Sequence, residues 1–197
     1  MGESKLIISP RKKKKGARIM SNKSKIESII IEYIYDANPD TSWLGEYTDE
    51  RGAGIIIREL NKFYEDITED ELEEYYELYP TSREFRGFKP YAGGEEVGTK
   101  EYKEYGMLDF KRIEGLAAGR WYFIGIKAKA DISFEESGVS HYQEICSGGI
   151  WGIESDNQSG IKEVEKEQID NLKQQLEHLN VDMSNFDEIE IQHKERD

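Results

Sequence analysis

The sequence contains a single cysteine, Cys146, among its 197 residues. One thiol cannot form a disulfide within the chain, so the composition fits a reducing compartment. Long hydrophobic runs are also missing: the apolar segment Leu6 to Ile8 is far shorter than a signal-peptide core, and no segment approaches the roughly 20 apolar residues of a membrane span. These absences predict a soluble cytoplasmic protein that has no contact with a membrane.

Histidine is scarce, and the common motifs of phosphate chemistry are absent. His141, His178 and His193 are scattered without the spacing of zinc ligands. No glycine-rich stretch ends in Gly-Lys-Ser/Thr, and no G-x-G-x-x-G motif occurs. Cys146 and His141 lie five residues apart on a predicted strand and so point to opposite faces, which favours a buried structural thiol over a nucleophile. We expect a protein that is not an enzyme and binds neither a metal nor another cofactor.

Net positive charge is confined to the N-terminus of an otherwise acidic chain. The formal net charge is −14, yet residues 1–19 hold seven basic side chains against Glu3. We expect residues 1–19 to be a disordered basic tail and residues 20–197 to form one domain that carries a charge of −20. Such a body repels nucleic acid and membrane surfaces and attracts basic proteins. An alternative role for the tail is direct contact with nucleic acid.

Alternating apolar and polar side chains predict the strands. Residues 25–36, KIESIIIEYIYD, form a core strand rich in β-branched residues. Residues 120–134 form the plainest strand, with Lys127 and Lys129 on a basic face. Residues 139–156 add one or two strands, which pair as a hairpin with the strand at residues 120–134. Residues 186–192 add a last short strand.

Capping signals and apolar stripes predict three helices. A capping box of Thr68 and Glu71 begins a helix that ends at Pro80, a second runs from Thr99 to Gly119, and a third covers residues 159–179. Residues 55–67 fit a helix slightly better than a strand. Residues 36–54 and 81–98 are expected to be loops.

Together these elements predict an α+β fold: an antiparallel sheet of about four to five strands with two or three helices packed mainly on one face. The other face of such a sheet is open, so a homodimer that covers it is a further possibility.

The glycine-rich stretch SGGIWGIESD, residues 147–156, raises the question of a ligand site. We interpret its glycines as a bend or bulge that lets Trp151 and Ile153 enter the core, while Glu154 and Asp156 face water. The alternative is a pocket near residues 147–156 in which the two carboxylates bind a ligand or a divalent cation or act as acid and base.

A second short stretch, SREFRGFKPY at residues 82–91, interleaves basic and aromatic side chains. This pattern occurs in proteins that bind single-stranded nucleic acid. The simpler interpretation is a loop whose aromatic rings pack on the core and whose cations pair with the preceding acidic helix.

The strongest compositional feature is the acidity of the first helix. Eight carboxylates lie within residues 65–77. On a helix, side chains three or four residues apart are about 5–6 Å from each other, so such a face can imitate a nucleic-acid backbone. A solvated face that only confers solubility is the alternative. The predicted partner-binding residues are Glu69, Glu73, Glu74 and Glu77, with Tyr75 and Tyr79 at the rim.

Four segments give the chain a family resemblance: SWLGEYTDE, GRWYFIGIKAKADI, SGGIWGIESD and the helix KEVEKEQIDNLKQQL. They resemble a family of mostly uncharacterised proteins of bacteriophages and mobile elements, over about residues 26–180. The chain also looks somewhat like a type II-A anti-CRISPR protein. This resemblance implies a counter-defence protein of the bacterial cytoplasm whose partner is a basic nucleic-acid-handling host protein, such as an RNA-guided nuclease.

Overall fold

The computed structural model describes residues 24–79, 86–136 and 138–196. The fold is α+β, as the sequence predicts, with three helices and two sheets among these residues. The tail predicted over residues 1–19 lies outside the described residues. The boundary of a single domain at residue 20 stays a prediction.

The larger sheet has five strands, with β6 (Phe123–Glu136) and β1 (Ser24–Tyr35) at its centre. β7 (Val139–Cys146) and β8 (Ile150–Glu154) both pair with β6 on its free side, and β9 (Ile191–Arg196) pairs with β1. All pairs are antiparallel except β1 with β9, which is parallel. The hairpin of β6 and β7 is confirmed.

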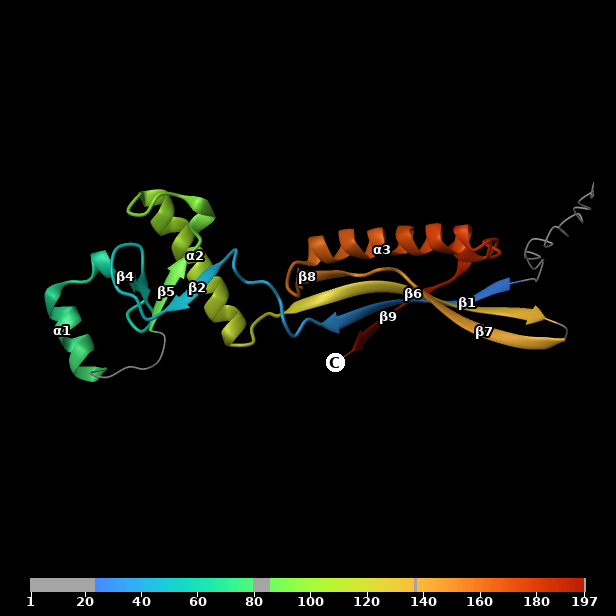
Figure 1. The fold of residues 1–197 in the computed structure, drawn as a ribbon, viewed down its shortest axis with the longest axis horizontal. Helices are drawn as coiled ribbons and strands as arrows, with labels where there is room; N and C mark the ends of the chain where they lie inside the picture. Colours follow the sequence, from blue (N-terminus) through green and yellow to red (C-terminus); the bar gives the residue numbers. More distant parts are fainter. Residues whose placement is uncertain (1–23, 80–85, 137, 197) are drawn as a thin grey trace, which may run out of the picture.

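The helix α3 (Gln158–His178) covers one face of the larger sheet (Figure 1). Its apolar stripe explains this position, because Leu172 and Leu176 are fully buried against strand residues such as Ile29, Ile31 and Ala128. We call these strands with α3 the large-sheet lobe.

The chain between β1 and β6 forms a second lobe, which we call the inserted lobe. Its small antiparallel sheet has the order β2 (Gly45–Thr48), β5 (Gly87–Pro90), β3 (Ile56–Ile57) and β4 (Lys62–Phe63). The helices α1 (Glu69–Leu78) and α2 (Lys100–Ala117) belong to it. Figure 1 shows the two lobes end to end, with α1 at one extreme and β7 at the other.

Each lobe has its own hydrophobic cluster of buried side chains. The cluster of the inserted lobe is rich in aromatic rings: Phe63, Phe88, Tyr102, Phe110, Trp121 and Phe123. Two of these residues, Trp121 and Phe123, lie where the chain enters β6, so the second cluster begins at the end of the larger sheet.

The helix expected over residues 55–67 is wrong. This segment forms β3, β4 and the short 3-10 helix η1 (Tyr64–Asp66). Ile55, Ile56 and Ile57 are all buried. A helix with one apolar stripe would expose at least one of three consecutive residues, whereas a strand that lies between two other strands can bury both of its faces. Asn61 makes the turn with a φ of 53°.

Two expected loops are also wrong in part, because β2 lies within residues 36–54 and β5 within residues 81–98. These strands pair with each other, with Tyr47 opposite Phe88. The last strand starts at Ile191, after a 3-10 helix η3 (Phe186–Glu188) in which Phe186 is buried.

Candidate functional site

The candidate site is the outer face of α1, and its start is set by local hydrogen bonds. The Thr68 hydroxyl accepts a hydrogen bond from the Glu71 amide at 3.3 Å, and the Glu71 carboxylate accepts one from the Thr68 amide at 3.0 Å. This is the predicted capping box, and it gives α1 a defined first turn. The helix ends at Leu78, and Pro80 lies outside the described residues.

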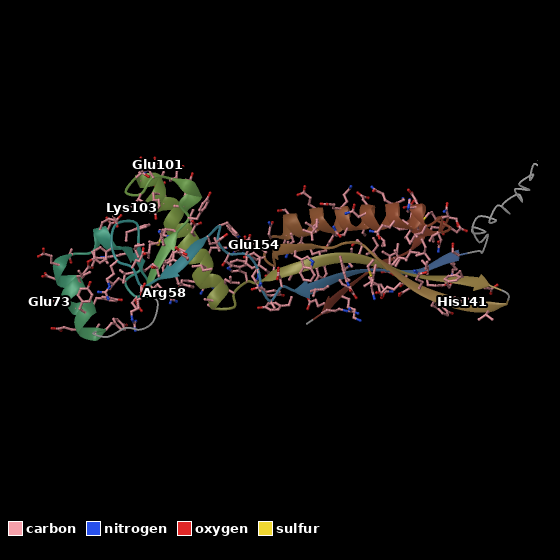
Figure 2. The ribbon with its side chains drawn as sticks, viewed as in Figure 1. Arg58, Glu73, Glu101, Lys103, His141 and Glu154 are labelled. Carbon is pink, nitrogen blue, oxygen red and sulfur yellow. The ribbon has the colours of Figure 1, made fainter. Side chains whose placement is uncertain are left out.

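The four carboxylates of α1 that the sequence predicts to bind a partner are all exposed, as is Asp70: Glu69, Glu73, Glu74 and Glu77. Glu73 lies on the side of α1 that faces away from the rest of the molecule (Figure 2). Across the described parts of the chain, no ion pair or hydrogen bond involves the side chains of these four residues, whereas Glu71 pairs with Lys62 at 2.5 Å. The four therefore form an acidic face directed to solvent.

A shallow hollow of about 460 Å³ lies on this acidic face of α1. Glu69, Glu73 and Glu77 line it together with Leu72 and Tyr76. A partner that fills the hollow would meet carboxylates and apolar side-chain surface together. This combination suits the long side chains of Lys and Arg, which have an apolar stem and a charged head.

The expectation for the two tyrosines needs correction. Tyr75 is only 3% exposed, so it lies beneath the helix and is not a rim contact. Its ring packs on Tyr79 with centroids 5.2 Å apart, and burial raises the pKa of its hydroxyl. Tyr79 is half-buried and lies under the Arg86 guanidinium, 4.1 Å from the ring centroid. Helical periodicity explains both positions, because Tyr75 and Tyr79 lie four residues apart on the inward side.

The stretch at residues 82–91 is described from Arg86 onward. Arg86 pairs with Glu59 and stacks on Tyr79, and Phe88 is fully buried in the second cluster. These contacts agree with the simpler interpretation of aromatic rings in the core, although the carboxylate that pairs with Arg86 precedes α1. Lys89 and Tyr91 are exposed.

The glycine-rich corner at residues 147–156 is a structural bend. Gly149 and Gly152 both have a φ of 77°, which side chains rarely adopt. The Gly149 amide donates to the side chain of Gln168, a buried residue of α3, at 3.0 Å. Trp151, expected in the core, is instead 52% exposed, and its indole covers Gly125. Ile153 does pack against the larger cluster.

The sequence predicts that Glu154 and Asp156 face water, but in the structure both carboxylates are bound by an arginine. Arg112 of α2 donates to both oxygens of Asp156, at 2.6 and 2.7 Å, and to Glu154 at 3.1 Å. The Arg112 guanidinium also stacks on Trp121 at 3.7 Å and lowers the pKa of Asp156. One guanidinium binds both carboxylates, which leaves them poorly suited to metal binding or to acid and base catalysis.

The role of Arg112 cannot be predicted from local sequence, because its partners lie 42 and 44 residues away in the chain. No local pattern marks such a pair. The arrangement fixes the corner to α2 and thus joins the two lobes.

Another charge cluster lies on the larger sheet around Glu32. This carboxylate is fully buried, with Lys127, Lys129 and Arg196 at 3.3, 3.4 and 3.0 Å. None of these contacts among the described residues has hydrogen-bond geometry. The basic face predicted for β6 is therefore largely neutralised by Glu32 and by Glu144, which pairs with Lys129 at 2.6 Å.

The remaining candidate residues are dispersed over the larger sheet. Cys146 is half-buried at the end of β7, and its thiol donates to Glu144 at 3.3 Å. Burial raises the pKa of that thiol. His141 stacks on Phe134 and His193 stacks on Tyr33. Within the described ranges there is no group of three His, Cys, Asp or Glu side chains arranged to hold a metal ion.

None of the described helices combines the length and apolar character needed to cross a membrane. Comparison with protein-family models, with curated proteins and with solved structures found no match to the chain.

Proposed function

We propose that this chain is a non-enzymatic binding protein of a phage or mobile element that inhibits a defence protein in the bacterial cytoplasm. The acidic face of α1 occupies a basic surface on which the host protein holds nucleic acid. An RNA-guided CRISPR nuclease is the first candidate, because such enzymes hold nucleic acid in positively charged channels.

The observation that carries this proposal is the row of exposed carboxylates on α1, which have no ion pair or hydrogen bond with any described residue. Glu69, Glu73 and Glu77 are spaced by four residues, so with a rise of about 1.5 Å per residue their Cα atoms advance by roughly 6 Å per step. Each step therefore places like charges side by side. This regular spacing is what a surface shaped for a phosphate backbone can accept.

The same row reduces the stability of the free helix. Like charges four residues apart destabilise a helix by about 0.2–0.5 kcal/mol per pair. The last turn of α1 contains Glu77 and no basic residue, so the negative end of the helix dipole carries another negative charge. A basic partner would relieve both effects, which gives the binding of α1 a favourable electrostatic contribution.

The test compares two triple variants of equal charge change. Glu69, Glu73 and Glu77 are replaced by Gln in the first variant, and the exposed Glu163, Glu167 and Glu177 of α3 are replaced by Gln in the control. Glutamine is about as good a helix former as glutamate, so both variants should fold. Binding to the guide-loaded type II-A nuclease and inhibition of DNA cleavage are measured at low and high salt.

Wild-type protein and the α3 control should bind and inhibit equally, and the α1 variant should lose at least tenfold in affinity. Added salt should weaken the wild-type interaction, because exposed charges are screened. Equal inhibition by the α1 variant would contradict the role of α1. Undiminished cleavage with a large excess of wild-type protein would reject this nuclease as the target.

A further inference from the structure

The strand β7 forms a free edge of the larger sheet. One side of β7 pairs with β6, and no described strand pairs with its other side. Residues 139–144 are all exposed, including Val139 at 56% and Tyr142 at 76%. An edge of this kind offers unpaired backbone groups to another strand.

The backbone groups that β7 offers can be assigned from its register. The Ser147 amide donates to the Ala128 carbonyl at 2.8 Å, and the pairing from Cys146 back to Val139 has no register shift. Inward and outward backbone groups alternate along an antiparallel strand. The N–H and C=O groups of Ser140, Tyr142 and Glu144 therefore point away from β6.

The opposite edge of the sheet, β9, carries charged residues that discourage pairing with another strand, and β7 has few of them. β9 carries Lys194, Glu195 and Arg196 in succession, and charged residues of this kind discourage pairing between edges. β7 contains no Lys, Arg or Pro, and Glu144 is its only acidic residue. The edge that lacks protection is the one that presents Val139 and Tyr142 to solvent.

We propose that two copies of this chain associate through β7 in antiparallel orientation, with Tyr142 opposite Tyr142 of the second copy. A twofold axis perpendicular to the sheet leaves each side chain on the same face of the sheet in both copies. Two residues that pair across the axis must therefore both have even numbers or both have odd numbers. In this register the outward groups of Ser140 meet those of Glu144, and those of Tyr142 meet each other.

The side chains favour this register over its neighbours. Val139 lies opposite Ile145, which gives an apolar pair at each end, and the two tyrosines pair at the centre. Glu144 faces the Ser140 hydroxyl, so the two Glu144 carboxylates are not opposed. A shift by two residues would place Tyr142 opposite Glu144, or Val139 opposite Gln143, and lose these pairs.

The shape of the chain is compatible with this association despite its net charge of −14. β7 lies at the end of the molecule farthest from α1 (Figure 1). Antiparallel pairing makes the two protomers extend in opposite directions from β7. The two acidic faces are thereby at opposite ends of the dimer, beyond the range of about 10 Å over which exposed charges interact at moderate salt.

Sedimentation equilibrium tests the association with a matched pair of variants. Tyr142→Lys should shift the protein to a monomer, because it places like charges directly opposite each other. Tyr105→Lys changes an exposed tyrosine of α2 and should leave the dimer intact. A wild-type protein that stays monomeric at every concentration, or a dimer that Tyr142→Lys leaves unchanged, would overturn the proposal.

Cysteine cross-linking tests the register of the two strands without relying on the folding of Tyr142→Lys. In a Cys146→Ser background, Tyr142→Cys should form an interchain disulfide on mild oxidation, because Cα atoms of such a pair lie about 5.5 Å apart. Ser140→Cys should not, because its two copies are separated by four residues along the strand, roughly 14 Å at about 3.4 Å per residue. Equal cross-linking of both variants, or of neither, would contradict this register.

Discussion

At the scale of the residue, the close contact between Trp151 and Gly125 shows what a single glycine contributes. A Cβ atom built on Gly125 would lie 2.3 Å from Cε3 of the Trp151 indole, far inside van der Waals contact. The need for glycine at residue 125 is therefore steric, whereas Gly149 and Gly152 are required by their positive φ. Trp151 can lie flat on β6 only because residue 125 has no side chain.

Gly125→Ala should therefore lower the free energy of unfolding by about 1–3 kcal/mol, as overpacking does in other proteins. Gly148→Ala is the matched control, because a Cβ atom there meets no atom within 4 Å and the φ of Gly148 is not in the positive range. Urea denaturation measures both, and the control should be neutral or slightly more stable. Equal stability of Gly125→Ala and wild type would show that the indole does not hold this position in solution.

At the scale of the element, α1 depends on Glu71 for its first turn. The Glu71 carboxylate binds the Lys62 ammonium and the Thr68 amide and hydroxyl, and these contacts lower its pKa from 4.5 to about 2. The contact with Lys62 is the largest cause. It also ties the helix to β4, so the helix start and the small sheet are coupled.

A carboxylate whose pKa is lowered by folding stabilises the folded state above its unfolded pKa and loses that contribution as the pH falls. The stabilisation from Glu71 should be complete above about pH 4.5 and lost by about pH 2. The ¹³C shift of the Glu71 carboxyl, followed by NMR, should give the lowered pKa. Lys62→Met should raise it, because the ammonium is removed while Thr68 remains. A normal pKa in the wild type would contradict the contact.

In the whole molecule, the two lobes are joined by Phe123 of β6, which packs in the cluster of the inserted lobe, and by polar contacts. The Ser155 amide donates to the Tyr122 carbonyl at 2.8 Å, and the Tyr122 amide donates to the Ser155 hydroxyl at 2.9 Å. Arg112 adds its bonds to Glu154 and Asp156. Its side chain is 27% exposed, so these charge-assisted bonds are partly shielded from water.

Arg112→Met should lower the free energy of unfolding by about 1.5–3 kcal/mol, the usual contribution of hydrogen bonds to charged groups. It should also accelerate hydrogen exchange at the amides of Tyr122 and Ser155. Lys111→Met is the control, because Lys111 is the exposed neighbour on the same helix. If both variants exchange and unfold alike, Arg112 does not join the lobes.

The elements that the sequence predicts well are those defined by local signals. Thr68, Glu71 and Thr99 mark helix starts within one turn, and the apolar stripe of α3 repeats over five turns, so each boundary can be derived without knowledge of the rest. The strands β2 to β5 have only two to four residues each. A period of two cannot be recognised over so short a segment, so the pattern of residues 55–67 predicts a helix where β3 and β4 form.

Local sequence patterns are enough to predict the α+β class, the helices α1, α2 and α3 and the exposure of the α1 carboxylates, because helical periodicity separates Glu73 and Glu77 from the buried Tyr75. Three features require the folded structure: Arg112 binds Glu154 and Asp156, Trp151 lies outside the core, and β7 is a free edge among the described strands. Each of these depends on which segments become neighbours. That choice is made by the packing of distant surfaces, and no local pattern of residues contains it.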